Sequence, residues 1–196
     1  MVKYAYDYSQ IKYNFKVVIV GESGVGKTSI IERYCFNQFP ENIQSTIGLS
    51  FHSVIIDAIQ GTDPIKIGLS LWDFGGQERF QSLLPQFILG ANGALMMFDF
   101  SQPESLERLG RWKQLMEKYI KNIPIHLIGN KYDLVESGKV FDVDPLKLKE
   151  NQEKLHISTY NKTSAKTGHN TGIVFKNLLQ DIYKWNYPKL PPITFN

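Results

Sequence analysis

The glycine-rich segment at residues 21–28, which reads GESGVGKT, constrains the fold of this chain more than any other feature. It follows an apolar run at residues 15–20 that predicts a buried β-strand, and it precedes residues 29–34, which predict the first turns of a helix. A strand, a glycine-rich loop and Lys-Thr at the start of a helix form the pattern of a phosphate-binding loop. The glycines allow positive φ angles, so backbone N–H groups can face one concavity, and the helix N-terminus adds the positive end of its dipole. The segment therefore predicts a phosphate site in which Lys27 contacts the phosphates and the Thr28 hydroxyl binds Mg²⁺.

Composition and the chain ends exclude several classes of protein. The 196 residues are 42% hydrophobic and 21% charged, which suits one globular domain. The formal charge is only +3 and there is no long Lys/Arg run, so the composition does not indicate nucleic-acid binding. The one cysteine, Cys35, cannot form an internal disulfide or a cysteine-based zinc cluster. There is no 18-residue apolar stretch, no signal peptide after Met1, no myristoylation glycine at Val2 and no prenylatable cysteine near Asn196. We therefore expect a cytoplasmic protein without a covalent membrane anchor at either terminus.

Strand and helix patterns alternate along most of the chain. A turn at residues 61–64 joins strand patterns at 51–59 and 65–72, which predicts an antiparallel hairpin. Further patterns predict strands at 93–98, 125–129 and 156–160, and helices at 106–120, 146–155 and around 175–182. This alternation predicts an α/β fold in which helices cover both faces of a mostly parallel sheet. Ligands of such sheets bind beyond the carboxyl ends of the strands.

Three local features add to this expectation. Ser101 and Glu104 have the spacing of a capping box, with Ser101 as the N-cap of the helix that follows. His126 lies in a strand pattern, where we expect a satisfied core or edge histidine rather than a metal ligand. Residues 1–14 carry Tyr4, Tyr6, Tyr8 and Tyr13, and form either a frayed arm or an arm that docks its tyrosines on the domain or a partner.

Residues 130–133, which read NKYD, have the chemistry of a guanine-binding motif. The Asp133 carboxylate can accept hydrogen bonds from both N1–H and the 2-amino group of guanine. Adenine has no donor at these positions, so ATP would leave a buried charge unpaired. On its own, such a short segment is as well explained by a polar turn. Its place between the phosphate-binding loop and the Thr-Ser-Ala-Lys segment at residues 163–166 favours the guanine-binding interpretation.

Four separated motifs, in this order and spacing, resemble those of Ras-like small GTPases, most closely the Rab branch: residues 21–28, 45–48, 73–76, and 130–133 with 163–166. The resemblance runs from about residue 15 to residue 185. It implies a P-loop NTPase fold, with a Ras-like G domain at residues 15–186 built on a mostly parallel six-stranded sheet. One strand of the hairpin would be antiparallel. Residues 1–14 would be an N-terminal arm and residues 187–196 a C-terminal tail.

The resemblance also implies which residues bind GTP or GDP. The expected nucleotide-binding residues are Ser23, Gly24, Val25, Gly26, Lys27, Thr28, Ser29, Phe39, Thr46, Gly76, Asn130, Lys131, Asp133, Ser164, Ala165 and Lys166. The Ala165 N–H would contact the guanine oxygen, and the stems of Lys131 and Lys166 would flank the base. Phe39 would pack on the edge of the base, or else serve as a core aromatic.

Residues 45–48 and 73–76 resemble the two switch segments of the family. Thr28 and Thr46 would bind Mg²⁺ directly and Asp73 through a water, while Thr46 and the Gly76 N–H would bond the γ-phosphate. Two loops tethered by one phosphate are released when that phosphate leaves. The expected catalytic residues for hydrolysis of the γ-phosphate are Gln77, which would orient the attacking water, with Lys27 and Gly76. Because no arginine lies in residues 42–45, we expect slow intrinsic hydrolysis that depends on a GTPase-activating partner.

Two departures from the Rab pattern bear on the expected function. Residues 74–76 read Phe-Gly-Gly where Rabs usually read Thr-Ala-Gly, and the added Gly75 should loosen the second switch. The prenylated cysteines that hold Rab and Ras proteins on membranes have no counterpart here.

The leading hypothesis is a GTP/GDP switch of signal transduction or vesicle trafficking. Effectors, exchange factors and activating proteins would bind residues 43–51 and 74–84. The alternative is a nucleotide-bound scaffold that barely hydrolyses GTP. An ATP-using enzyme is disfavoured by Asp133.

Overall fold

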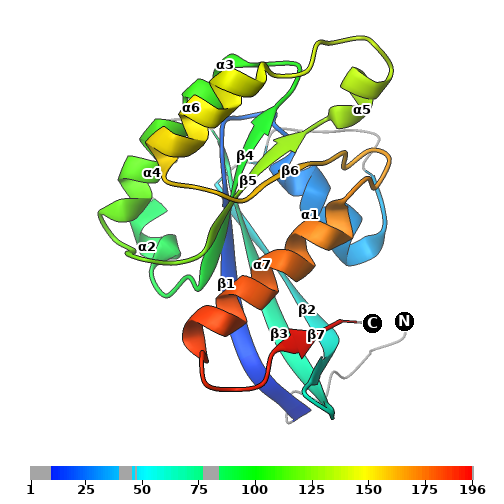
Figure 1. Ribbon diagram of the computed structural model, residues 1–196, viewed down its shortest axis with the longest axis vertical. Coiled ribbons are helices and arrows are strands. Elements are labelled where there is room, and N and C mark those ends of the chain that lie inside the picture. Colours follow the sequence, from blue (N-terminus) through cyan, green and yellow to red (C-terminus); the bar gives the residue numbers. More distant parts are fainter. Residues whose placement is uncertain (1–9, 40–45, 47, 77–83, 196) are drawn as a thin grey trace.

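The computed structural model describes residues 10–39, 46, 48–76 and 84–195, which form one sheet with helices against both faces (Figure 1). The strands are β1 Ile11–Val20, β2 Leu49–Gln60, β3 Asp63–Phe74, β4 Gly93–Asp99, β5 Ile125–Asn130, β6 Tyr160–Lys162 and β7 Ile193–Thr194. The helices are α1 Lys27–Phe36, α2 Leu84–Ile88, α3 Glu104–Glu107, α4 Leu109–Glu117, α5 Tyr132–Glu136, α6 Pro145–Leu155 and α7 Thr171–Asn186.

The described residues place the strands in the order β6-β5-β4-β1-β3-β2-β7. Strand β1 pairs in parallel with β3 and β4, and the parallel order continues through β5 to β6. Strands β2 and β3 form the predicted antiparallel hairpin. The α/β fold with a mostly parallel sheet is therefore confirmed.

The expected number of six strands is wrong, because the described part of the chain forms a seven-stranded sheet. The additional strand β7 pairs antiparallel with β2, placing Ile193 opposite Gln60 and Thr194 opposite Ile59. Ile193 is buried against the core shared by α1 and α7. A two-residue strand is too short to show the period-two alternation from which strands are predicted, so its pairing depends on a contact with a distant segment.

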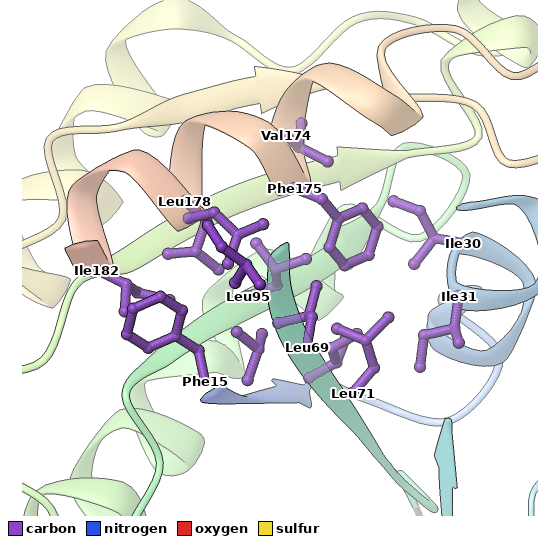
Figure 2. Packing of buried hydrophobic residues seen from close by; sticks show 14 of the residues in the cluster. Phe15, Ile30, Ile31, Leu69, Leu71, Leu95, Val174, Phe175, Leu178 and Ile182 are labelled. Carbon is purple, nitrogen blue, oxygen red and sulfur yellow. The ribbon is translucent and has the colours of Figure 1, made fainter. Parts of the chain in front are cut away.

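The sheet separates two hydrophobic cores. Val17 and Ile19 of β1 face the core covered by α1 and α7, whereas Val18 and Val20 face the core to which α2, α3, α4 and α6 contribute. Figure 2 shows the first core, where Phe175, Leu178 and Ile182 of α7 pack over the sheet residues Leu69, Leu71 and Leu95. Where both faces of a strand are buried, as in residues 17–20 of β1 and 93–98 of β4, the sequence is a continuous apolar run; the first half of β1 instead alternates.

The predicted helix at residues 106–120 is interrupted. It forms as α3 and α4, separated at Arg108, although Leu106, Leu109, Trp112 and Met116 are buried as their helical spacing predicts. The capping box is wrong: α3 begins at Glu104 with Pro103 as its N-cap. The Ser101 hydroxyl instead donates a hydrogen bond to Asp99 Oδ1 over 2.7 Å.

The predicted strand at residues 156–160 is also wrong over most of its length. His156 adopts a left-handed conformation with φ of 52° and caps α6, so β6 begins only at Tyr160. The apolar Ile157 that suggested a strand is buried, but in the connection between these elements. Burial alone does not distinguish a strand from a buried connection, which explains the error.

His126 and Tyr13 both lie in the core of the domain. His126 is a core residue, as expected: it is buried in β5 and its Nε2 lies 2.8 Å from Asp181 Oδ2 of α7. Its Nδ1 has no hydrogen-bond partner among the described residues, so the histidine is satisfied at one ring nitrogen. Tyr13 lies within β1 and packs against Tyr183 and Tyr187 of the C-terminal helix region. The other three tyrosines of residues 1–14 lie outside the described residues. Among the described residues, no helix is both long and apolar enough to cross a bilayer.

Candidate functional site

The segment at residues 21–28 connects β1 to α1, as the sequence predicts. Gly24 and Gly26 have φ angles of 80° and 97°, which side chains with a Cβ rarely adopt. A Cβ on Gly26 would also lie 2.2 Å from Asn130 Nδ2, and one on Gly21 would lie 2.3 Å from the Met97 carbonyl oxygen. The loop therefore needs glycine both for its backbone conformation and for its close packing against β4 and β5.

A cavity of about 390 Å³ lies over this loop, at the carboxyl ends of several strands. Its lining residues come from six separate segments: Ser23, Gly24, Gly26, Lys27, Thr28, Ser29, Phe39, Thr46, Gly76, Asn130, Lys131, Asp133, Leu134, Ala165 and Lys166. The structure thus brings together most of the residues that the motifs single out. Gln77 lies outside the described residues.

Two of the expected nucleotide-binding residues, Val25 and Ser164, do not line the cavity but contact residues that do. The Val25 side chain is buried in the core, and its carbonyl accepts a hydrogen bond from Asn130. Ser164 donates a hydrogen bond to Asp133 Oδ1 over 2.6 Å and so orients that carboxylate. Conversely, Leu134 lines the cavity although the motif analysis did not identify it. No sequence signal distinguishes this leucine from an ordinary helix residue.

Thr28, Thr46 and Asp73 meet at one side of the cavity. The Thr28 hydroxyl donates to Asp73 Oδ2, and Thr46 Oγ1 lies 2.6 Å from Thr28 Oγ1 and 3.5 Å from the same carboxylate oxygen. Asp73 is buried, and its Oδ1 has no hydrogen-bond partner among the described residues. Burial raises the pKa of Asp73, against the hydrogen bond from Thr28 and the positive charge of Lys27. A buried carboxylate oxygen without a partner, beside two hydroxyls, is a set of hard oxygen donors that fits Mg²⁺.

Lys27 extends along the phosphate-binding loop. Its Nζ donates hydrogen bonds to the carbonyl oxygens of Gly21 and Glu22, over 3.0 and 2.8 Å. Burial lowers the pKa of Lys27 to about 8, although the negative charges of Asp73 and Glu22 raise it. The two hydrogen-bond acceptors of this buried ammonium group are neutral carbonyls. An anion would stabilise the ammonium further, so this position suits a phosphate.

Gly76 packs directly on the phosphate-binding loop. A Cβ at this position would lie 2.3 Å from both the Glu22 carbonyl carbon and the Ser23 nitrogen. The preceding Gly75 N–H donates to the Gly48 carbonyl over 2.9 Å, which joins the end of β3 to the start of β2. The segment that follows Asp73 is thus in contact with the loop, and only glycine fits there.

At the other end of the cavity, Asn130 connects three segments. Its Nδ2 donates to the Val25 carbonyl over 2.9 Å, and its Oδ1 accepts from the Ala165 N–H over 3.1 Å and from the Thr163 hydroxyl over 3.3 Å. The Ala165 N–H, expected to contact a guanine oxygen, is therefore paired with Asn130 in this structure. Asn130 itself is buried.

Lys131 forms an ion pair, and Arg33 forms hydrogen bonds, that the sequence motifs do not indicate. Lys131 lines the cavity, and its Nζ lies 2.6 Å from Oδ2 of the buried Asp99. Arg33 of α1 donates to the Ala165 carbonyl over 2.9 Å and to the Lys166 carbonyl over 2.8 Å. Arg33 thereby holds residues 163–166 against α1. Sequence reasoning missed it because the residues in contact are far apart in the chain.

Comparison with known proteins agrees with this geometry. The sequence pattern of the Ras family matches residues 16–184. The Ras-related protein Rab-11A of Dictyostelium discoideum is 36% identical over 172 residues, which cover 87% of this chain and 77% of that protein. The Ras-related protein Rab-27B of Rattus norvegicus is 38% identical over 181 residues, covering 88% and 81% of the two chains. With its phosphate-binding loop and NKYD segment lining one cavity, this chain belongs to the Ras family, in its Rab branch, and is a small GTPase that binds guanine nucleotides.

Proposed function

We propose that this protein is a Mg²⁺-dependent GTP/GDP switch that hydrolyses GTP slowly unless a GTPase-activating partner assists. The observation that supports it most strongly is the convergence of Thr28, Thr46 and Asp73. These residues belong to the phosphate-binding loop and to the two proposed switch segments. A nucleotide that engages all three would hold both switch segments to the loop, and loss of its terminal phosphate would release them.

The proposed roles divide between the two ends of the cavity. At the phosphate end, the N–H groups of residues 23–29 and the Lys27 ammonium would hold the phosphates, and the Gly76 N–H would contact the γ-phosphate. The two threonine hydroxyls and Asp73 would hold Mg²⁺, whose charge would stabilise the phosphate oxygens. At the base end, Asp133 would accept the guanine donors, while Phe39 and the stems of Lys131 and Lys166 would pack on the base. Gln77 would orient the attacking water.

Two observations support the proposal of slow intrinsic hydrolysis. Residues 42–45, just before Thr46, contain no arginine. The cationic residues among the described cavity lining are Lys27, Lys131 and Lys166, again without an arginine. A charge that stabilises the transition state would then have to come from a partner, which would approach along residues 43–51 and 74–84.

Two measurements test this proposal. The first identifies the nucleotide that the purified protein carries, and the second compares single-turnover GTP hydrolysis by the wild type and by Gln77→Leu. We expect bound GDP or GTP, slow hydrolysis by the wild type, and much slower hydrolysis by Gln77→Leu. Equal rates for the two proteins would instead support the alternative of a scaffold that barely hydrolyses GTP, which the added Gly75 favours. A purified protein without guanine nucleotide in Mg²⁺ buffer would contradict the proposal.

A further inference from the structure

Glu22, the second residue of the phosphate-binding loop, points its side chain away from the cavity lining and toward α4. Its Oε1 accepts a hydrogen bond from Trp112 Nε1 over 3.1 Å. Arg111 donates to the same oxygen over 3.4 Å, and Arg108 lies 3.6 Å from Oε2. Only 15% of the Glu22 side chain is exposed, so its carboxylate is largely removed from water and depends on these partners.

The hydrogen bond from Trp112 contributes more to the attachment of Glu22 to α4 than the two arginines do. Trp112 is 1% exposed, and its indole N–H is a donor that must find an acceptor when it is buried. The two arginine side chains are about half exposed, where ion pairs contribute little because water screens them. Without Glu22, the buried indole N–H would lose the acceptor with which it is paired.

The backbone of the same residue contacts two groups of the proposed nucleotide site. The Glu22 carbonyl accepts the Lys27 hydrogen bond, and its carbonyl carbon is the atom against which Gly76 packs. At the other end of the loop, Asn130 holds the Val25 carbonyl. The loop is therefore attached at both ends, to β5 through Asn130 and to α4 through Glu22.

We propose that Glu22 is a positioning residue, which holds the first turn of the phosphate-binding loop to α4 through Trp112 and so places Lys27 and Gly76 for the nucleotide. This inference rests on the proposed function, because it assigns Glu22 a part in holding a nucleotide at this loop. A loop fixed in its binding conformation before the ligand arrives loses less conformational entropy on binding. Detaching one end should therefore speed nucleotide release.

The experiment measures GDP dissociation in Mg²⁺ buffer for the wild type, Glu22→Ala, Glu22→Gln, Trp112→Phe and the Glu22→Ala/Trp112→Phe double variant. We expect about tenfold faster dissociation for Glu22→Ala, since a buried hydrogen bond is lost. Glu22→Gln keeps an acceptor for the indole and should restore nearly wild-type dissociation. Trp112→Phe keeps a buried ring but removes the indole N–H that donates to Glu22. If both residues act through this one hydrogen bond, the double variant should release GDP no faster than the faster single variant. The ³¹P NMR signal of the β-phosphate of bound GDP should shift in Glu22→Ala, because the loop around it has moved.

Glu107→Gln serves as the matched control, since Glu107 forms an exposed ion pair with Lys147 at 3.5 Å. It should leave both the dissociation rate and the ³¹P signal unchanged. If Glu22→Ala only lowers the melting temperature, with unchanged GDP dissociation and ³¹P signal, the positioning role is overturned and the proposed function stands. Additive effects of Glu22→Ala and Trp112→Phe would also overturn it. A wild-type protein that does not bind GDP would overturn the proposed function itself.

Discussion

Nδ2 of Asn130 lies 2.9 Å from the Val25 carbonyl oxygen, so the strand end that precedes Asp133 holds the phosphate-binding loop directly. The same side chain accepts the Ala165 N–H. Asn130 therefore couples the phosphate end of the cavity to its base end.

The first prediction concerns this coupling. Asn130→Ala removes three hydrogen bonds and leaves the Ala165 N–H and the Val25 carbonyl without their buried partner. We expect GDP affinity to fall by about tenfold or more, measured by isothermal titration calorimetry. Asn151→Ala is the control, because the Asn151 amide bonds only the Lys147 carbonyl on the exposed surface of α6. Equal GDP affinities for Asn130→Ala and the wild type would refute the coupling.

Asp133→Asn should weaken guanine binding by about ten- to a hundredfold, because it replaces a charged double acceptor with a mixed donor and acceptor. Competition of GDP against a fluorescent GDP analogue measures the change. Asp142→Asn is the matched control: Asp142 is an exposed carboxylate paired with Lys162 and does not line the cavity. Unchanged GDP affinity in Asp133→Asn would count against the assigned base pocket.

Gly76→Ala tests the contact between the proposed second switch segment and the phosphate-binding loop. The added Cβ would lie 2.3 Å from the loop backbone, so residue 76 would have to move away. We expect single-turnover GTP hydrolysis to slow by about tenfold or more. GDP affinity should change less, because GDP lacks the γ-phosphate that the Gly76 N–H is proposed to contact.

The matched control for this variant is Gly110→Ala in α4, where an added Cβ meets no atom within 4 Å. It should hydrolyse GTP at the wild-type rate and be slightly more stable, since alanine favours helix over glycine. Normal hydrolysis by Gly76→Ala would show that this close packing is not required.

His126 should make stability depend on pH. Burial lowers the pKa of His126 below its ordinary value of 6.5, although the hydrogen bond and charge of Asp181 oppose the shift. Between the lowered pKa of the folded state and 6.5, the unfolded chain binds more protons than the folded one. Stability contributed by neutral His126 is therefore present above pH 6.5 and is lost as the pH falls. Urea unfolding from pH 7.5 to pH 5 should show this decline.

A variant separates His126 from the other titrating groups. His126→Gln should show a smaller decline in unfolding free energy over the same pH range, while the exposed His156→Asn should follow the wild type. Parallel pH profiles for His126→Gln and the wild type would exclude His126 as the source.

The last prediction concerns strand β7. Ile193 is 2% exposed, so Ile193→Ala should reduce the free energy of unfolding by about 2 kcal/mol. Thr194→Ala, at the exposed neighbouring position, should change it by less than about 0.5 kcal/mol. Hydrogen exchange should also become faster at the Gly61 amide, which donates to the Pro192 carbonyl. If both variants unfold like the wild type, the docking of β7 contributes nothing to stability.

The motifs could be found in the sequence because each depends on local geometry. Glycine at positions 24 and 26 permits backbone angles that other residues avoid, and residues 17–20 of β1 and 93–98 of β4 appear as unbroken apolar runs. The patterns also predicted where the loops would gather, since the carboxyl ends of parallel strands meet at one edge of the sheet.

Other features depended on contacts that no local pattern encodes. A helical spacing identified the buried face at Leu106, Leu109 and Trp112, but not the interruption at Arg108. Leu134 and Arg33 could not be assigned to the site from the sequence, because the cavity that Leu134 lines and the Ala165 carbonyl that Arg33 contacts are brought to them only by folding.

The sequence by itself determined the α/β class and the phosphate-binding loop, and it led to the proposed guanine-binding segment, because glycine conformation, side-chain periodicity and hydrogen-bonding chemistry are properties of short stretches. Only the tertiary structure decided that β7 extends the sheet and that Asn130 and Glu22 attach the two ends of the loop. These relationships join residues distant in the chain. They form because folding buries polar groups that must then find partners wherever the packing places them.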